Sequence, residues 1–243
     1  ALSRISTFLS RKSCSITQLQ SVLGQLFFLS RVLHPGRVFL GRLLHLLRLN
    51  KHKTRFKLSP AARADLQMWQ QFLPTWKGLS MFHDDHWSAQ DLTLITTDAS
   101  LKGSGATIGN SYLCHEWSPP ELASAERSSH SSAPYLETRA IAIAVCTWAP
   151  LLAGKKVKIF TDCLPAANAL RKGWSTDPHT QAQIRAIQRM AMTHDTQLRF
   201  AHIAGTSNTA CDMLSRLRLQ EFQTSFGNYA QSSPVTLPDE HLA

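Results

Sequence analysis

The chain has 243 residues, of which 43% are hydrophobic and 17% charged, so it holds enough apolar material for a packed globular core. No apolar run approaches the ~18 residues of a membrane span, which argues against a membrane protein. The five cysteines are widely spaced and form no C-x-x-C pair, which argues against a disulfide framework or a zinc knuckle and favours a reducing, intracellular compartment. The chain begins with Ala1 and has no readable secretory signal, so we expect a piece of a longer chain.

The positive charge is concentrated in the first part of the chain. The formal net charge is +10; residues 1–90 hold 13 Lys and Arg against 3 Asp and Glu, whereas residues 91–243 hold 13 of each. No acidic residue precedes Asp65, so this segment would attract a polyanion through counterion release. Nucleic acid is the expected partner, and a solvated basic face or an anionic membrane surface are the alternatives.

The first 80 residues are predicted to be helical throughout. Ser15 with Gln18 is a capping-box signature, and a helix with apolar residues at helical spacing follows to about Leu33. Two further helices are expected over residues 37–49 and 59–73, the latter opened by a cap and a first-turn proline. Their apolar stripes predict a small core.

The other side of these helices is basic and remains free for a ligand. Arg37 and Arg42 are the candidate substrate-binding residues on it. Residues 1–90 are therefore interpreted as a small, basic, all-helical segment.

From residue 91 the pattern changes to short runs of Leu, Ile, Thr and Val that alternate with helical stretches, which is typical of an α/β domain. The expected elements are strands at 92–98, 103–108 and 111–117 in an antiparallel meander, a loop over 118–133, a helix at 134–152, a strand at 156–162, helices at 165–171 and 179–194, a strand at 198–203 and a helix that opens near Asn208. We assign the domain to residues 91–218. Residues 219–243 have few apolar residues and are expected to be a flexible tail or linker.

Four motifs then carry a resemblance to a known family. They are LITTDAS at 94–100, YLETRAI at 135–141, IFTD at 159–162 and HIAGTSNTACDMLSR at 202–216. The chain resembles the thumb-to-RNase H region of Gypsy-type and DIRS-type retroelement reverse transcriptase polyproteins, over roughly residues 15–218. The resemblance implies an RNase H-like mixed five-stranded sheet of order 3-2-1-4-5 with flanking helices, preceded by a thumb and connection segment.

The candidate catalytic and metal-binding residues are Asp98, Glu137, Asp162 and Asp212. Asp98 and Asp162 are expected at the ends of neighbouring parallel strands, and Glu137 and Asp212 in the first turns of helices, so the four carboxylates are predicted to converge. Carboxylates are the ligands that Mg²⁺ prefers, and two such ions about 4 Å apart activate water and stabilise the leaving oxygen in phosphodiester hydrolysis.

By resemblance, Asp98 bridges both ions, Asp212 helps to hold the ion that activates water, and Glu137 with Asp162 holds the ion near the leaving oxygen. The ordinary alternative is that these are surface charges. A first-turn acid also stabilises its helix by ~0.3–1 kcal/mol through the helix dipole, which would explain Glu137 and Asp212 without a metal.

Three further residues are candidates for the same site. His202 stands ten residues before Asp212, the interval of the loop histidine in retroviral RNases H, but its predicted place on a strand favours a structural role over a catalytic one. Ser100 and Asn208 are candidate substrate-binding residues, and the alternative is that Ser100 caps a turn and Asn208 caps the last helix.

The resemblance implies an endoribonuclease that cleaves the RNA strand of RNA/DNA hybrids with two Mg²⁺ or Mn²⁺ ions. The polymerase palm and fingers would be partners in the same polyprotein, and the helical segment would hold the hybrid by its phosphates. One alternative is a non-catalytic nucleic-acid-binding module, connection-like or domesticated, which the retention of all four acids argues against. Another is a transposase or integrase, which would need a catalytic Glu in a late helix, where this chain has Asp212.

Overall fold

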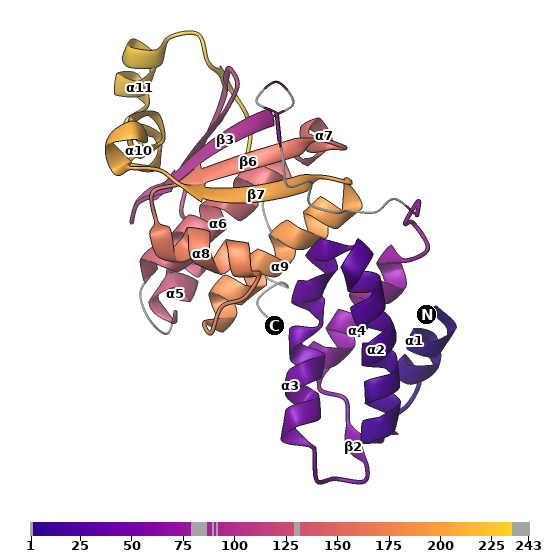
Figure 1. Ribbon diagram of the computed structural model, residues 1–243. Helices are drawn as coiled ribbons and strands as arrows, with labels where there is room; N and C mark the ends of the chain where they lie inside the picture. Colours follow the sequence, from indigo (N-terminus) through magenta and orange to yellow (C-terminus); the bar gives the residue numbers. More distant parts are fainter. Residues whose placement is uncertain (1, 79–86, 89, 91, 129–131, 235–243) are drawn as a thin grey trace. The chain divides into compact units, whose positions relative to one another are not determined.

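The computed structural model describes the whole chain except residues 1, 79–86, 89, 91, 129–131 and 235–243. The chain divides into two compact units, residues 1–84 and 85–243 (Figure 1). The boundary expected between residues 90 and 91 falls on a residue outside the described part. Among the described helices, none combines the length and the apolarity needed to cross a bilayer.

The first unit is a helical bundle with a short two-stranded ribbon, so the prediction that residues 1–80 are helical throughout is wrong at the ribbon. Its elements are α1 (Leu2–Leu9), β1 (Ser13–Cys14), α2 (Ile16–Val32), the 3-10 helix η1 (His34–Phe39), α3 (Gly41–Leu49), β2 (Phe56–Lys57) and α4 (Pro60–Phe72). The capping box predicted at the start of α2 is present: the backbone N–H of Gln18 donates to Ser15 Oγ, and the N–H of Ser15 donates to Gln18 Oε1. The predicted helix therefore begins where its cap was found.

The helix expected over residues 37–49 is divided, and its first part is η1. Here the backbone of Gly36 packs so closely on the buried ring of Trp69 that a Cβ at this position would lie 2.4 Å from Trp69 Cη2. The unit also contains α1, for which no bounds were predicted; it buries Ile5 and Phe8 and packs on α4.

The second unit is an α/β domain. Its elements are β3 (Leu92–Ala99), β4 (Gly103–Ile108), β5 (Ser111–Glu116), α5 (Pro119–Glu126), α6 (Ser132–Thr147), α7 (Ala149–Leu152), β6 (Lys156–Thr161), α8 (Leu164–Lys172), α9 (Pro178–Thr193), β7 (Gln197–His202), η3 (Gly205–Ser207), α10 (Thr209–Ser215), α11 (Leu219–Phe226) and β8 (Ala230–Gln231). The sheet order is β7-β6-β3-β4-β5-β8. The strands β3, β4 and β5 pair antiparallel, whereas β3–β6, β6–β7 and β5–β8 are parallel. The mixed α/β fold with flanking helices is confirmed, and so is the predicted order of the first five strands.

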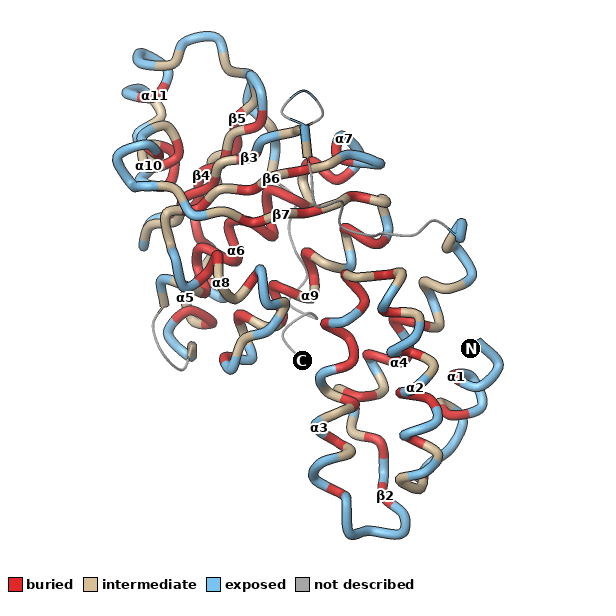
Figure 2. The backbone as a smooth tube through the Cα atoms, viewed as in Figure 1, coloured by how far each residue is buried: buried red, intermediate tan, exposed pale blue. Residues whose placement is uncertain are grey.

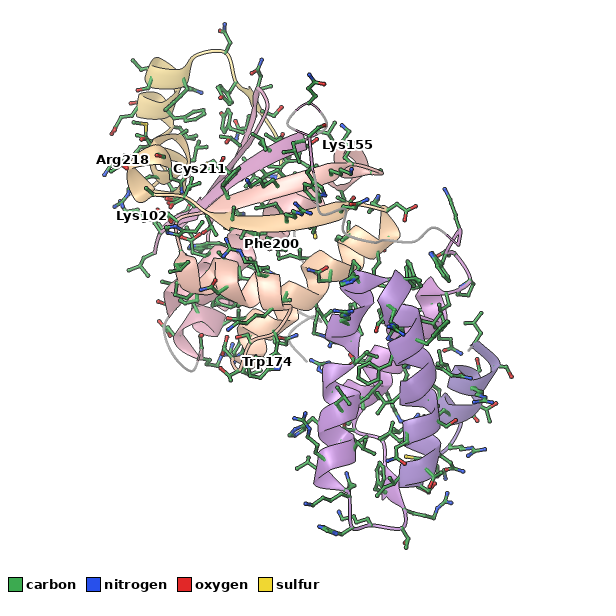
Figure 3. The ribbon with its side chains drawn as sticks, viewed as in Figure 1. Lys102, Lys155, Trp174, Phe200, Cys211 and Arg218 are labelled. Carbon is green, nitrogen blue, oxygen red and sulfur yellow. The ribbon has the colours of Figure 1, made fainter. Side chains whose placement is uncertain are left out.

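Helices cover both faces of this sheet. Figure 1 shows α6, α8 and α9 on one side and α10 and α11 on the other. The helix α6 packs between the sheet and α9, so residues 135–145 are buried along its length, in the red centre of Figure 2. On the other face Cys211 of α10 lies against the sheet (Figure 3), and its thiol donates to the backbone oxygen of Thr96 at 3.2 Å.

The loop expected over residues 118–133 contains the helix α5. Ser118 and Glu121 form a capping box, which the sequence S-P-P-E could have indicated. Two further side chains, one from β5 and one from α6, hold Glu121: His115 Nε2 lies 3.0 Å from Glu121 Oε2, and Arg139 Nε lies 3.0 Å from Glu121 Oε1. These contacts hold α5 against β5 and α6.

Residues 219–231 form α11 and β8 instead of the flexible tail expected from residue 219. Phe222 is fully buried and contacts the rings of Tyr112, Phe226 and Tyr229. The strand β8 pairs with β5, so the sheet has six strands and not the expected five. The apolar cluster explains why this segment is ordered despite its low apolar content.

Candidate metal centre

Three of the predicted acids meet at one end of the sheet. Asp98 is near the end of β3, Asp162 directly follows the parallel neighbour β6, and Glu137 projects from α6. Each offers a carboxylate oxygen, and these oxygens lie within 4.8 Å of one another. Glu137 is the sixth residue of α6 and not in its first turn as expected, because the helix begins at Ser132.

Both oxygens of the Asp98 carboxylate are held by α10 and the residue before it. Ser215 Oγ donates to Asp98 Oδ2, and Asn208 Nδ2 donates to Asp98 Oδ1 at 3.3 Å and to the backbone oxygen of Thr97 at 3.0 Å. Asp98, Asn208 and Ser215 are all buried. The carboxylate is therefore fixed in one orientation while retaining further lone pairs.

Glu137 is held in the same way. The backbone N–H of Ala99 donates to Glu137 Oε1 at 3.3 Å, and Thr161 Oγ1 donates to Glu137 Oε2 at 2.9 Å. Because Ala99 follows Asp98 and Thr161 precedes Asp162, these bonds tie the helix to the ends of both strands.

Burial and mutual repulsion raise the pKa values of two carboxyl groups in this cluster. Burial raises the pKa of Asp98 to about 6, against the hydrogen bond from Ser215, and the charges of Asp162 and Asp212 add to the rise. Burial, followed by the charge of Asp98, raises the pKa of Glu137 to about 8. In the described part of the chain none of Asp98, Glu137 and Asp162 forms an ion pair, and the charge of Arg216 only partly offsets the rise in the pKa of Asp98.

The fourth predicted acid, Asp212, lies in the first turn of α10 as expected but outside this group of three. Its Oδ1 accepts from Arg216 Nε at 2.7 Å in a partly exposed ion pair. Asp212 is near enough to raise the pKa of Asp98.

The structure gives Ser100, Asn208 and His202 local contacts. Ser100 Oγ donates to the backbone oxygen of Ser215 at 2.7 Å and accepts from the N–H of Lys102, so it shapes the β3–β4 turn. Asn208 makes no side-chain cap bond to α10 and contacts Asp98 instead. His202 ends β7, where its Nε2 lies 3.0 Å from the backbone oxygen of Asp162.

Arg37 and Arg42 belong to the first unit, and the structure gives them different surroundings. Arg37 is exposed on η1. Arg42 is half-buried on α3, where burial lowers the pKa of its guanidinium.

Sequence reasoning missed three residues around the carboxylates. Two are the hydroxyl donors Ser215 and Thr161. The third is Gly205, where a Cβ would lie 3.2 Å from Asp162 Oδ2. All three lie inside the four sequence motifs. Their nearness in sequence to the predicted acids could have marked them as candidate residues of the site.

Comparison with known proteins gives fold likenesses only. No family model and no curated protein matches the chain. An RNase H1 isolated from compost by a metagenomic approach, LC11-RNase H1, is 16% identical with a TM-score of 0.40, covering 54% of this chain and 97% of its own. RNase H1 from the halophilic archaeon Halobacterium salinarum is 13% identical with a TM-score of 0.39, covering 54% and 98%.

A prototype foamy virus protease–reverse transcriptase is 18% identical with a TM-score of 0.33, covering 79% of this chain and 24% of its own. At such low sequence identity these likenesses are likenesses of backbone fold and not of function.

Proposed function

We propose that residues 91–218 form an endoribonuclease that cleaves the RNA strand of RNA/DNA hybrids with divalent metal ions. The observation that carries the proposal is the meeting of Asp98, Glu137 and Asp162, whose oxygens lie within 4.8 Å of one another and form no ion pair with any Lys or Arg among the described residues. Crowded, buried carboxylates are costly unless they are protonated or bind a cation.

The donor set suits Mg²⁺ or Mn²⁺. All the converging ligand atoms are carboxylate oxygens, which hard divalent cations prefer, and no His or Cys belongs to the group. When bound, such ions supply a Lewis acid that activates water and stabilises the leaving oxygen of a phosphodiester. Asp98, Glu137 and Asp162 would hold the metal, and Asp212 would complete the ligands of a second ion.

The remaining side chains keep these ligands in place. Ser215 and Asn208 orient the Asp98 carboxylate, and Thr161 orients Glu137, so little rearrangement is needed when a cation arrives. With a pKa of about 8, Glu137 holds a proton near neutral pH that has to leave when a metal binds, whereas Asp98, with a pKa of about 6, is already largely ionised there.

The wider setting belongs to the same proposal. The four sequence motifs favour a reverse transcriptase polyprotein of the Gypsy or DIRS type, with the polymerase palm and fingers as partners. The basic first unit would act as its thumb and connection segment and hold the hybrid by its phosphates. Contacts to 2′-hydroxyl groups would select the RNA strand.

The test is cleavage of a labelled RNA/DNA hybrid in Mg²⁺ by the wild-type chain, Asp98→Asn and Asp162→Asn. Each substitution should lower the rate roughly 10²–10⁴-fold, because a bound metal contributes several kcal/mol to transition-state stabilisation. Glu126→Gln, an exposed acid on α5, is the matched control and should cut like wild type. Equal cutting by all four proteins would reject the site, and tight binding of hybrid without cutting would favour the non-catalytic module.

A further inference from the structure

The first unit has a surface of one charge. Residues 2–78 contain 13 Lys and Arg, and their single acid, Asp65, is fully buried. No carboxylate therefore reaches the described surface of this unit.

Three of its arginines gather around the ribbon of β1 and β2. The charges of Arg55, Arg11 and Arg63 all act to lower the pKa of the buried thiol of Cys14 on β1, although burial raises it overall. Arg55 donates from Nη2 to Ser13 Oγ at 3.1 Å and to the backbone oxygen of Ser13 at 3.2 Å. Arg63 donates from Nη1 to the backbone oxygen of Leu9 at 2.7 Å and from Nη2 to that of Arg11 at 2.6 Å, so both guanidinium groups are held in place.

The turn that leads into β2 adds more positive charge. Residues 51–55, with Lys51 and Lys53, are all exposed and project from the end of the helical unit (Figures 1 and 2). The turn is ordered by two bonds: the N–H of Lys53 donates to the backbone oxygen of Asn50 at 2.9 Å, and Asn50 Nδ2 donates to that of Leu46 at 2.9 Å. Lys57 pairs with Ser13 across the ribbon.

We name this surface the basic ribbon; its members are Arg11, Lys12, Lys51, Lys53, Arg55, Lys57 and Arg63. We propose that the basic ribbon binds the phosphate backbone of nucleic acid, at a site on the first unit that is separate from the acidic centre. Held guanidinium groups and hydroxyls bind phosphates without reading bases, so sequence preference should be slight. The choice of an RNA/DNA hybrid as the ligand rests on the proposed function, but phosphate binding does not.

The surroundings of the ribbon favour nucleic acid over a membrane surface. Membrane-surface segments insert apolar side chains beside their basic ones. Residues 50–55 contain no apolar side chain, and Phe56, the next residue, is buried at 7% exposure. Leu49, directly before the turn, is 65% exposed, and this single leucine offers little apolar surface for insertion into a membrane.

The test is a salt titration of binding, followed by fluorescence anisotropy of a labelled 20-base-pair RNA/DNA hybrid without divalent metal. Lys51→Gln with Lys53→Gln removes two ribbon charges. Arg31→Gln with Lys77→Gln removes two exposed charges elsewhere in the unit and is the matched control. The ribbon variant should reduce the slope of log K against log salt by about 2, at about 0.9 per lost phosphate contact, and the control should leave the slope near that of wild type.

The outcomes separate this proposal from the nuclease. Equal loss of slope in both double variants would show diffuse attraction and overturn it, as would an unchanged slope in the ribbon variant. Ribbon-dependent binding to phosphatidylserine vesicles, with no binding to the hybrid, would assign the surface to a membrane instead. The titration measures binding without divalent metal and involves no cleavage. If the acidic centre proves inactive, the result for the basic ribbon therefore still stands.

Discussion

Replacing Gly105 with alanine should displace α10 from the acidic centre. Gly105 lies on β4 and is the cross-strand partner of Asp98. A Cβ at this position would lie 2.5 Å from Leu214 Cβ, 2.6 Å from the backbone oxygen of Cys211 and 2.8 Å from the backbone nitrogen of Ser215. Two of these atoms are backbone, so a rotamer change cannot relieve the contact.

The size of the effect follows from these distances. Reaching ordinary contact at 3.4 Å requires a shift of about 0.6–0.9 Å by α10, which carries Asp212 and Ser215. We expect Gly105→Ala to lower the free energy of unfolding by about 1–3 kcal/mol, as overpacking does, and to slow cleavage by up to about 10²-fold, as a misplacement near 1 Å does.

The assay pairs urea denaturation with hybrid cleavage, and Gly109→Ala is the control. Gly109 has φ +51° and open space around the missing side chain, so its alanine variant should lose about 1 kcal/mol to backbone strain and keep its cleavage rate. Wild-type stability and rate in Gly105→Ala would refute the reasoning, and so would an equal loss of rate in Gly109→Ala.

The remaining predictions concern single side chains. Ser215→Ala frees Asp98 Oδ2 and should raise the Mg²⁺ concentration for half-maximal cleavage about 10-fold, whereas Ser215→Thr should largely restore it; unchanged Mg²⁺ dependence in the alanine variant would count against the contact. Glu137 keeps its proton up to a pKa of about 8, against an ordinary 4.5, so the folded state holds a proton that the unfolded state has lost between these values. Stability in EDTA should therefore fall as pH rises from 5 to 8, and Glu137→Gln should flatten that fall; a profile that rises in wild type would contradict the assigned burial. Phe222→Ala should destabilise the second unit by about 3 kcal/mol in urea denaturation, and a change below 0.5 kcal/mol would mean that α11 contributes little to it.

The carboxylates that follow strands were the predictable part of the site. Asp98 and Asp162 come after runs of strand-forming residues, and the ends of neighbouring parallel strands must lie side by side. The order of five strands followed from the same pattern and the resemblance noted in the four sequence motifs. The position of Glu137 relative to its helix start was less predictable, since helix ends shift by one or two residues without changing the pattern.

Contacts between distant segments were not predictable in this way. The bond from Ser215 to Asp98 depends on how closely α10 approaches β4, which Gly105 permits and which no local spacing reveals. The order of residues 219–231 likewise depends on Phe222 reaching Tyr112 of β5, far along the chain. The capping box at Ser118 was a local signal for α5 that the prolines and serines around it obscured.

The position of bound Mn²⁺ tests the central claim most directly, because manganese is located in crystals by its anomalous scattering. We predict anomalous peaks about 2.0–2.3 Å from carboxylate oxygens of Asp98 and Asp162, with Glu137 as a further ligand, and loss of these peaks in Asp98→Asn. Crystals in millimolar Mn²⁺ with no peak among these carboxylates, or with peaks only elsewhere on the chain, would contradict the account.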